Sequence, residues 1–227
     1  MAGDRKREKP TVIFLDAVGT LFGVQGSVGH VYREVAQSVG VEVDPIALNK
    51  AFYQCFKAAG LPAFGVTDPI TVRQKEYDWW KKIAIATFKQ AGALPQFADF
   101  DGFFAQLYHH FSTTAPWFVY PDVRPALQRW RDMEIQLGIL SNFDSRLYAV
   151  LDALELSHFF TSVTISTEVG AAKPDAQIFQ TALQKHLCQP EWAWHIGDRF
   201  DEDYQAARAA GLRGIWLRRK ETEYLNE

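Results

Sequence analysis

Cysteine is scarce in this chain: its 227 residues include only Cys55 and Cys188, which lie far apart. Two distant thiols build neither a disulfide framework nor a four-cysteine metal site. The sequence also lacks an excess of positive charge, because 24 Lys and Arg stand against 27 Asp and Glu, for a net charge of -3. This balance gives no support to generic binding of a phosphate backbone, so we expect no nucleic-acid partner.

Long hydrophobic runs are absent as well, and the chain opens on a strongly charged stretch. Residues 1–10 read MAGDRKREKP, and no apolar segment as long as a signal peptide or a membrane span follows them. We therefore expect a disordered tail over residues 1–10 and no membrane partner. Two thiols without a secretory signal are typical of a reducing compartment, which predicts a cytoplasmic protein. The sequence does not indicate the oligomeric state.

The composition is otherwise that of a folded protein, with 48% hydrophobic and 22% charged residues. After Pro121, short apolar runs alternate with stretches of helical periodicity, which predicts βαβ units and a parallel sheet. Strands are expected at 11–15, 135–140, 162–166, 192–196 and 213–217, with helices at 122–132, 144–154, 175–187 and 201–210. The predicted fold class is α/β, with a doubly wound, Rossmann-like parallel sheet.

The segment from residue 23 to residue 116 has a different pattern. It contains no convincing strand, and helices are expected at 28–39, 46–59, 71–91 and 100–111. Asp44 followed by Pro45 is a typical helix start. The first strand has no partner unless it joins the later sheet, so this segment is an insertion. We predict a core of residues 11–22 and 117–227 and a helical cap of residues 23–116.

Polar side chains follow the predicted strands where each strand ends, and parallel sheets bind ligands at that edge. They are Asp16, Ser141, Asn142, Lys173, Asp198 and Asp203. Carboxylates such as Asp16 and Asp198 suit Mg²⁺, which prefers oxygen ligands. With the metal offsetting the repulsion between two anions, Asp16 could attack a phosphate to form an aspartyl phosphate. Lys173 would add positive charge, and the Ser141 hydroxyl would donate to a phosphoryl oxygen.

The stretches FLDAVGTLF, ILSN, AAKPD and GDRFDED closely resemble the four motifs of the haloacid dehalogenase (HAD) superfamily of hydrolases, subfamily IA. Their order and spacing match over residues 12–217, and the helical insertion falls where that superfamily places its cap. The stretches SNFDSRL, AAKPDAQIFQTAL and HIGDRFDEDYQAARAAG are most similar to the subgroup of rhythmically-expressed-gene-2-like and HAD-like hydrolase domain-containing 3 proteins.

The resemblance implies a role for each matching residue. Asp16 is the expected nucleophile, and Mg²⁺ is the expected cofactor, held by Asp16, the backbone carbonyl of Val18, Asp198 and Asp203. Asp203 is expected to support either the metal or Lys173, which orients Asp16 and the phosphate. The substrate's phosphate is expected on Ser141, Asn142, Lys173 and Thr20. The implied substrate is a small phosphorylated metabolite.

Val18 departs from the pattern of the superfamily's phosphatases, which carry a second Asp at this position. That Asp protonates the leaving group and then activates water, and losing such a group costs about 10²–10⁴-fold in rate. We therefore expect slow turnover, a preference for acidic leaving groups, or a proton carrier from the cap. One alternative is a weak or inactive homologue that binds a phosphorylated ligand or a protein. Another is a phosphonatase-like enzyme that cleaves a C–P bond with a cap lysine, Lys50 or Lys57.

For several residues, a purely structural role is an alternative to a role in the site. Asn142 could cap the next helix, as could Asp144, and Asp203 could merely favour the helix dipole of its first turn. Trp79 and Trp80 could stack on a substrate ring, although a cap core is the stronger interpretation. Arg146 and Arg199 could bind an anionic tail, and His195 is expected to pack in the core. The glycines of the cap entry predict a flexible hinge: Gly23, Gly26 and Gly29.

Overall fold

The computed structural model describes residues 9–219, and its centre is a five-stranded parallel sheet. In space the strands run β5 (Ser162–Ile165), β4 (Gln136–Ser141), β1 (Val12–Leu15), β6 (Ala193–Gly197) and β7 (Arg213–Trp216). Every neighbouring pair is parallel. The predicted parallel α/β fold is therefore confirmed, and β1 takes the central place between β4 and β6.

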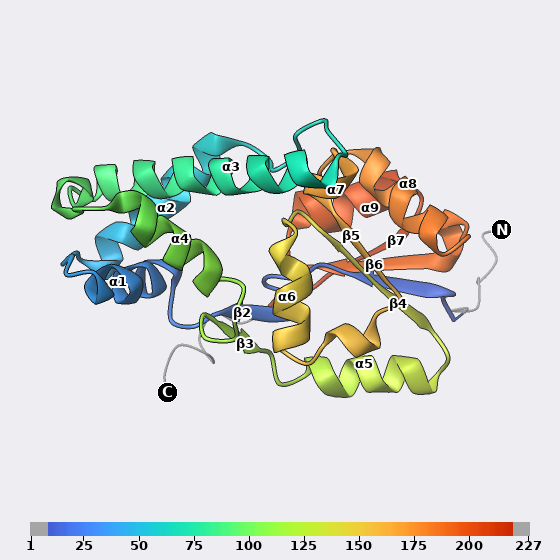
Figure 1. Ribbon diagram of the computed structural model, residues 1–227. Helices are drawn as coiled ribbons and strands as arrows, with labels where there is room; N and C mark the ends of the chain where they lie inside the picture. Colours follow the sequence, from blue (N-terminus) through green and yellow to red (C-terminus); the bar gives the residue numbers. More distant parts are fainter. Residues whose placement is uncertain (1–8, 220–227) are drawn as a thin grey trace.

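The sheet is covered by helices on both faces, which is why its strands are continuous apolar runs. All four residues of β1 are buried, and successive side chains point to opposite faces. Ile13 and Leu15 belong to one apolar cluster, whereas Val12 and Phe14 belong to another. Figure 1 shows helices α5 (Val123–Asp132) and α6 (Arg146–Ala153) on one side of the sheet, and α8 (Ala176–Lys185) and α9 (Ala206–Ala209) on the other.

Two connections differ from the predicted pattern. The strand expected to reach residue 166 ends at Ile165, and a short helix α7 (Ser166–Val169) follows at once. The helix expected from residue 201 begins as a π-helix, Phe200–Gln205, before α9. Three short 3₁₀ segments complete the connections: Leu94–Gln96, Ser157–Phe159 and Pro190–Trp192.

The insertion folds into helices α1 (Val28–Ser38), α2 (Pro45–Ala59), α3 (Pro69–Gln90) and α4 (Phe100–His110). Each begins at a side-chain cap, and the predicted helix start at Asp44 is confirmed by its bonds to the amides of Ile46 and Ala47. These helices share an apolar core of their own, and both Trp79 and Trp80 pack against it. The interpretation of these tryptophans as cap core is therefore confirmed.

A small antiparallel sheet lies where the insertion joins the core. It pairs β2 (Phe22–Val24) with β3 (Trp117–Val119). The prediction that no strand occurs between 23 and 116 is wrong, because Gly23 and Val24 belong to β2. Gly23 packs against the Phe118 ring, where an added Cβ would lie 2.6 Å from Cζ. A run of only three residues is too short to give a clear alternation in the sequence.

The predicted tail lies mostly outside the described residues, which begin at Lys9. Lys9 is exposed, but Pro10 is already buried. Both cysteines of the chain are free thiols. Within residues 9–219, no helix is long and apolar enough to cross a membrane.

Candidate active site

A buried lysine joins two carboxylates at the carboxyl edge of the sheet. Asp16 follows the last residue of β1, and Lys173 Nζ lies 2.7 Å from its Oδ1. The same Nζ lies 2.5 Å from Asp203 Oδ1. Burial alone would lower the pKa of Lys173, but the carboxylates of Asp16 and Asp203 raise it above its ordinary value. Lys173 is therefore a fixed cation between two anions.

Asp203 is fully buried and both of its oxygens have protein donors. Oδ1 accepts from Lys173 and from His195 Nε2, at 2.9 Å, and Oδ2 accepts from the amide of Arg199, also at 2.9 Å. Burial opposes ionisation of Asp203, but the Lys173 cation holds its pKa well below the ordinary value. Of the expected roles for Asp203, this geometry favours the orientation of Lys173.

His195 lies in β6 with no exposed surface, which confirms the prediction of a core residue. The structure adds a polar contact that the sequence did not indicate, because His195 Nε2 faces Asp203. Burial lowers the pKa of His195, which favours the neutral ring, and we assign its proton to Nε2, which faces the carboxylate, because Nδ1 has no partner among the described residues. The His195 ring also makes a T-shaped contact with Phe179, with 5.6 Å between the ring centroids.

The side chain of Asn142 binds both the amide and the carbonyl of Lys173. Its Oδ1 accepts from the Lys173 amide at 2.7 Å, and its Nδ2 donates to the Lys173 carbonyl at 2.9 Å. Nδ2 also donates to Glu202 Oε2 at 3.1 Å. Ser141, at the end of β4, is buried beside it. The interpretation of Asn142 as a helix cap is wrong, because α6 begins only at Arg146 and its preceding residue is Ser145.

Asp198 follows β6 and completes the acidic cluster. Its Oδ1 is buried and has no hydrogen-bond partner among the described residues. Burial raises the pKa of Asp198 to about 7, and the charges of Asp16 and Asp203 add to this rise. Gly19 has a φ of +85° and passes so close that an added Cβ would lie 2.5 Å from Asp198 Oδ2. The site thus holds a carboxylate that lacks a positive partner.

These residues fit a divalent cation. One oxygen each from Asp16, Asp198 and Asp203 lies within 4.8 Å of the others. The donor set consists of oxygen alone, which suits Mg²⁺, and the orphaned Asp198 Oδ1 is an atom that such a cation would satisfy.

The turn after Asp16 carries two further predicted site residues. Val18 forms an isolated bridge with Phe22. The residue is 36% exposed, and its side chain offers no group that transfers a proton. Thr20 is buried, and its Oγ1 has no partner in residues 9–219. Arg219 clamps this turn from the other end of the chain, since its Nε donates to the Gly19 carbonyl at 3.2 Å and its Nη2 to the Thr20 carbonyl at 2.5 Å.

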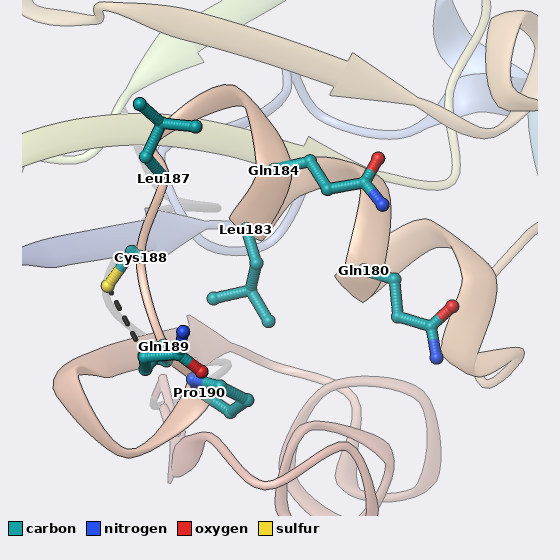
Figure 2. A pocket seen from close by; sticks show the side chains of 7 residues that line it. All are labelled: Gln180, Leu183, Gln184, Leu187, Cys188, Gln189 and Pro190. Carbon is teal, nitrogen blue, oxygen red and sulfur yellow. Dashed lines mark hydrogen bonds between the residues drawn. The ribbon is translucent and has the colours of Figure 1, made fainter.

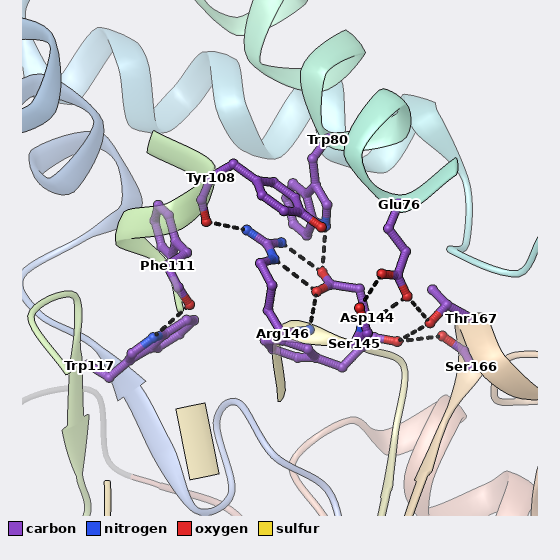
Figure 3. Close-up of polar contacts among 11 residues, drawn as sticks. Glu76, Trp80, Tyr108, Phe111, Trp117, Asp144, Ser145, Arg146, Ser166 and Thr167 are labelled. Atoms are coloured by element: carbon purple, nitrogen blue, oxygen red, sulfur yellow. Dashed lines mark hydrogen bonds and ion pairs between the residues drawn. The ribbon is translucent and has the colours of Figure 1, made fainter. Parts of the chain in front are cut away.

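The cap meets the core at a buried polar network shown in Figure 3. Trp80 Nε1 donates to Asp144 Oδ2 at 2.6 Å, and Arg146 binds both oxygens of Asp144, at 2.8 and 2.7 Å. The guanidinium also lies over the Tyr108 ring, 4.0 Å from its centroid. Asp144 Oδ1 also accepts from the amide of Arg146, the first residue of α6, at 3.0 Å, which agrees with the predicted capping role of Asp144. Trp80 and Arg146 are occupied within the protein, so the structure does not favour a substrate ring or an anionic tail on them.

The remaining residues that the sequence offered as candidates for substrate binding or catalysis do not belong to the cluster around Asp16. The Arg199 side chain is 69% exposed and lies 3.9 Å from Glu202. Lys50 and Lys57 are exposed on α2. Trp79 donates to the Ala59 carbonyl inside the cap, at 3.4 Å. No described contact links these four side chains to Asp16.

A separate pocket of about 400 Å³ lies at the opposite edge of the sheet (Figure 2). It is formed by the end of α8 and the loop that leads into the amino end of β6. Its lining side chains are Gln180, Leu183, Gln184, Leu187, Cys188, Gln189 and Pro190. It brings no carboxylate, lysine or histidine together and does not compete with the cluster around Asp16.

Three residues that shape the site were missed at the level of sequence. His195 lies in an ordinary strand, and the only signal that could have pointed to it is its place three residues before Asp198. Arg219 stands outside any motif near the end of the chain. Glu76 reaches the core from the cap helix α3, and only the three-dimensional packing of that helix shows it.

Comparison with known proteins gives a consistent set of relatives. A family model described as haloacid dehalogenase-like hydrolase matches residues 10–211. The mouse (Mus musculus) haloacid dehalogenase-like hydrolase domain-containing protein 3 is 35% identical over 207 residues, 88% of this chain and 78% of that protein. The rhythmically expressed gene 2 protein of Drosophila melanogaster is 31% identical over 225 residues, 94% of this chain and 85% of that protein. A crystal structure of a dehalogenase superposes with a TM-score of 0.70 at 19% identity, over 96% of this chain and 90% of that one, which shows a shared fold.

Proposed function

The chain belongs to the haloacid dehalogenase-like hydrolase family, and from this premise we propose that it is a Mg²⁺-dependent, phosphatase-type hydrolase. Its substrate would be a small phosphorylated metabolite, and its intermediate an aspartyl phosphate on Asp16. The observation that supports this most strongly is the cluster of Asp16, Lys173 and Asp198 at one edge of the sheet. A nucleophile, a fixed cation and an unsatisfied metal-binding carboxylate meet there.

Asp16 and Asp198 would hold the metal, together with the backbone carbonyl of Val18. Bound Mg²⁺ supplies positive charge that offsets the repulsion between the Asp16 carboxylate and an anionic phosphate. Asp203 would serve the site through Lys173, because its oxygens already accept from Lys173, His195 and the Arg199 amide.

In the first step, Asp16 forms a bond to phosphorus while the bond from phosphorus to the leaving oxygen breaks. Lys173 holds Oδ1 of Asp16 at 2.7 Å, and we therefore assign the attack to Oδ2. The Lys173 cation stabilises the ionised nucleophile and the charge on the transferring group. The buried hydroxyls of Ser141 and Thr20 at the same edge would donate to the phosphoryl oxygens, and Asn142 would serve the phosphate through Lys173, whose backbone its side chain holds.

Val18 determines which leaving groups the site can release. The departing oxygen takes up no proton from residue 18, so it leaves as an anion. Acyl and aryl phosphates release stable anions, whereas alkyl phosphates do not, and we propose that the former turn over faster. In the second step, water attacks phosphorus and frees Asp16, with its proton passing to the product phosphate or to solvent. Without a carboxylate at residue 18 this step is slow as well.

Val18 also supports one alternative function, that of a binding protein. A homologue that binds a phosphorylated ligand without turning it over would keep the phosphate site and lose the proton-transfer group, and Val18 fits that description. No observation favours the phosphonatase-like alternative, since Lys50 and Lys57 are exposed on the cap. We keep the cytoplasmic location, and the absence of nucleic-acid and membrane partners, as predictions.

A turnover assay distinguishes the enzyme from the binding protein. Acetyl phosphate and 4-nitrophenyl phosphate are supplied with Mg²⁺, with and without a chelator. Activity that needs Mg²⁺ and disappears in Asp16→Asn supports the hydrolase. Binding of inorganic phosphate without any turnover by the wild-type protein, combined with turnover by Val18→Asp, would support the binding protein instead.

A further inference from the structure

The cap contributes one buried carboxylate to the core, and the chemistry proposed above does not use it. Glu76 lies in the second turn of α3, and only 1% of its surface is exposed. Figure 3 shows its side chain extending from the cap toward the core segments that carry Ser145 and Thr167. A buried carboxylate is costly unless hydrogen bonds satisfy it, so its partners identify what it holds.

The partners of Glu76 all belong to the core. Oε1 accepts from the Ser145 amide at 2.9 Å and from Thr167 Oγ1 at 2.5 Å, and Oε2 accepts from Ser145 Oγ at 2.5 Å. Burial raises the pKa of Glu76, while the bonds from Ser145 and Thr167 oppose that rise. The nearby Asp144 is held separately by Trp80 and Arg146.

These two partners come from the two loops that build the phosphate site. Ser145 lies in the loop that leaves β4, three residues after Asn142. Thr167 lies in α7, which opens the segment that leads from β5 to Lys173. Asn142 itself binds the backbone of Lys173, so a shift between the two loops would displace both ends of that contact.

We propose that Glu76 is a positioning residue of the active site, a carboxylate from the cap that joins the loop carrying Ser141 and Asn142 to the segment carrying Lys173. Docking of the cap thereby sets the geometry in which a phosphate is received. This inference rests on the proposed function for its consequence, although the joining of the two loops can be measured without any reaction. A misplacement of about 1 Å at such a site can cost about 10²-fold in rate.

The test compares Glu76→Leu with Glu76→Gln. Leu leaves the Ser145 amide without its Glu76 acceptor, and it leaves the Thr167 hydroxyl with only the Phe143 carbonyl, at 3.4 Å. In Gln, the amide oxygen can accept from both of these donors, and the amide nitrogen can donate to Ser145 Oγ. Asp78 provides matched controls, Asp78→Leu and Asp78→Asn, because it is exposed on the same helix. Two properties are measured: the affinity for inorganic phosphate in the presence of Mg²⁺, and the hydrogen exchange of peptides covering 141–146 and 166–173.

We expect Glu76→Leu to weaken phosphate binding by about tenfold or more and to speed exchange in both peptides, with no change at the distant strand β7. Glu76→Gln should restore both properties, and the Asp78 variants should match the wild type. If Glu76→Leu does not fold, Thr167→Val removes one of the three bonds to Glu76, together with the longer contact of the same hydroxyl to the Phe143 carbonyl at 3.4 Å. It should speed exchange in the 166–173 peptide and weaken phosphate binding to a smaller extent.

The inference would be overturned if Glu76→Leu and Thr167→Val both bound phosphate as tightly as the wild-type protein and showed the same hydrogen exchange in the two peptides. It would also be overturned by faster exchange spread evenly over the molecule, because that would indicate only a general loss of stability. If the wild-type protein binds no phosphate, the proposed function fails. The exchange of the two peptides then still decides whether Glu76 joins the loops.

Discussion

Lys173 and Asp16 form a buried ion pair, with 2.7 Å between Nζ and Oδ1, although 157 residues separate them in the chain. The pair forms because β1 is inserted between β4 and β6, which brings Asp16 to the same sheet edge as the loop after α7. Asp203 shares the same ammonium group. The charge balance of the whole site therefore depends on one lysine.

Replacing Lys173 with Met should damage both stability and activity. The change leaves Asp16 and Asp203 buried without their cation, and breaking such a pair by removing one partner typically costs about 3–5 kcal/mol. We expect the free energy of unfolding, measured in urea, to fall by an amount in this range and phosphatase turnover to drop by at least about 10²-fold. Lys89→Met, on the exposed face of α3, is the control. A Lys173→Met protein as stable and active as this control would contradict the assigned role.

Replacing Val18 with Asp should raise turnover. The new carboxylate would stand next to the nucleophile, where it can protonate the leaving oxygen and then activate water, an effect of about 10²–10⁴-fold. The gain should be larger for alkyl phosphates than for 4-nitrophenyl phosphate, whose anion needs no proton. Val18→Asn has a similar shape but transfers no proton, and equal rates for the Asn and Asp variants would refute this account of residue 18.

Replacing Gly19 with Ala should weaken the binding of Mg²⁺. The added Cβ would lie 2.5 Å from Asp198 Oδ2 and would displace a proposed metal ligand. We expect about a tenfold or greater rise in the Mg²⁺ concentration needed for half-maximal activity, and a matching loss in calorimetric titration with Mg²⁺ alone. Gly92→Ala is a matched control, because Gly92 also has a positive φ, of +74°, but no atom lies within 4 Å of its added Cβ. Equal metal affinity in both variants would place the metal elsewhere.

The sequence predicts the sheet and most of the cluster because the relevant signals are local. Each strand is a short apolar run, and Asp16, Ser141 and Asp198 stand where such a run ends. The contacts that orient these residues are not local. His195 has the surroundings of any core residue, and its link to Asp203 depends on the π-helical turn after β6, which the sequence presents as an ordinary helix.

The contacts between cap and core were also beyond the sequence. From the sequence alone Arg146 could bind an anion, but in the structure its guanidinium pairs with Asp144 and lies against the Tyr108 and Trp80 rings of the cap. Glu76 lies on a helix with charged residues on several sides, and nothing in its spacing distinguishes it from the exposed Asp78. Which face of α3 meets the core is decided by tertiary packing.

The stability of the protein should depend on pH through Glu76. Burial raises the pKa of Glu76 above its ordinary value of 4.5, so the folded state takes up this proton more readily than the unfolded chain. As pH rises from about 4.5 through the higher pKa of the folded state, this carboxyl should lower the free energy of unfolding. Glu76→Gln lacks the titrating group, and its stability relative to the wild type should therefore increase with pH over this window and then level off.

Urea unfolding of both proteins, from the ordinary carboxyl pKa to neutral pH, measures this difference. Asp78→Asn, which removes an exposed charge from the same helix, is unfolded beside them as the control for the loss of a carboxyl on α3. A stability difference between wild type and Glu76→Gln that is constant over the window, or that changes in the opposite direction, would mean that the folded protein does not raise the pKa of Glu76.

The central claim is that Asp16 carries the phosphoryl group during the reaction, and trapping that intermediate tests it most directly. The wild-type protein is mixed with acetyl phosphate and Mg²⁺, quenched in acid, digested and mapped by mass spectrometry. We predict a Mg²⁺-dependent phosphoryl adduct on the peptide that contains Asp16, stable enough to accumulate because Val18 activates no water, and absent from Asp16→Asn. Turnover that persists unchanged in Asp16→Asn, with no adduct on this peptide, would contradict the account.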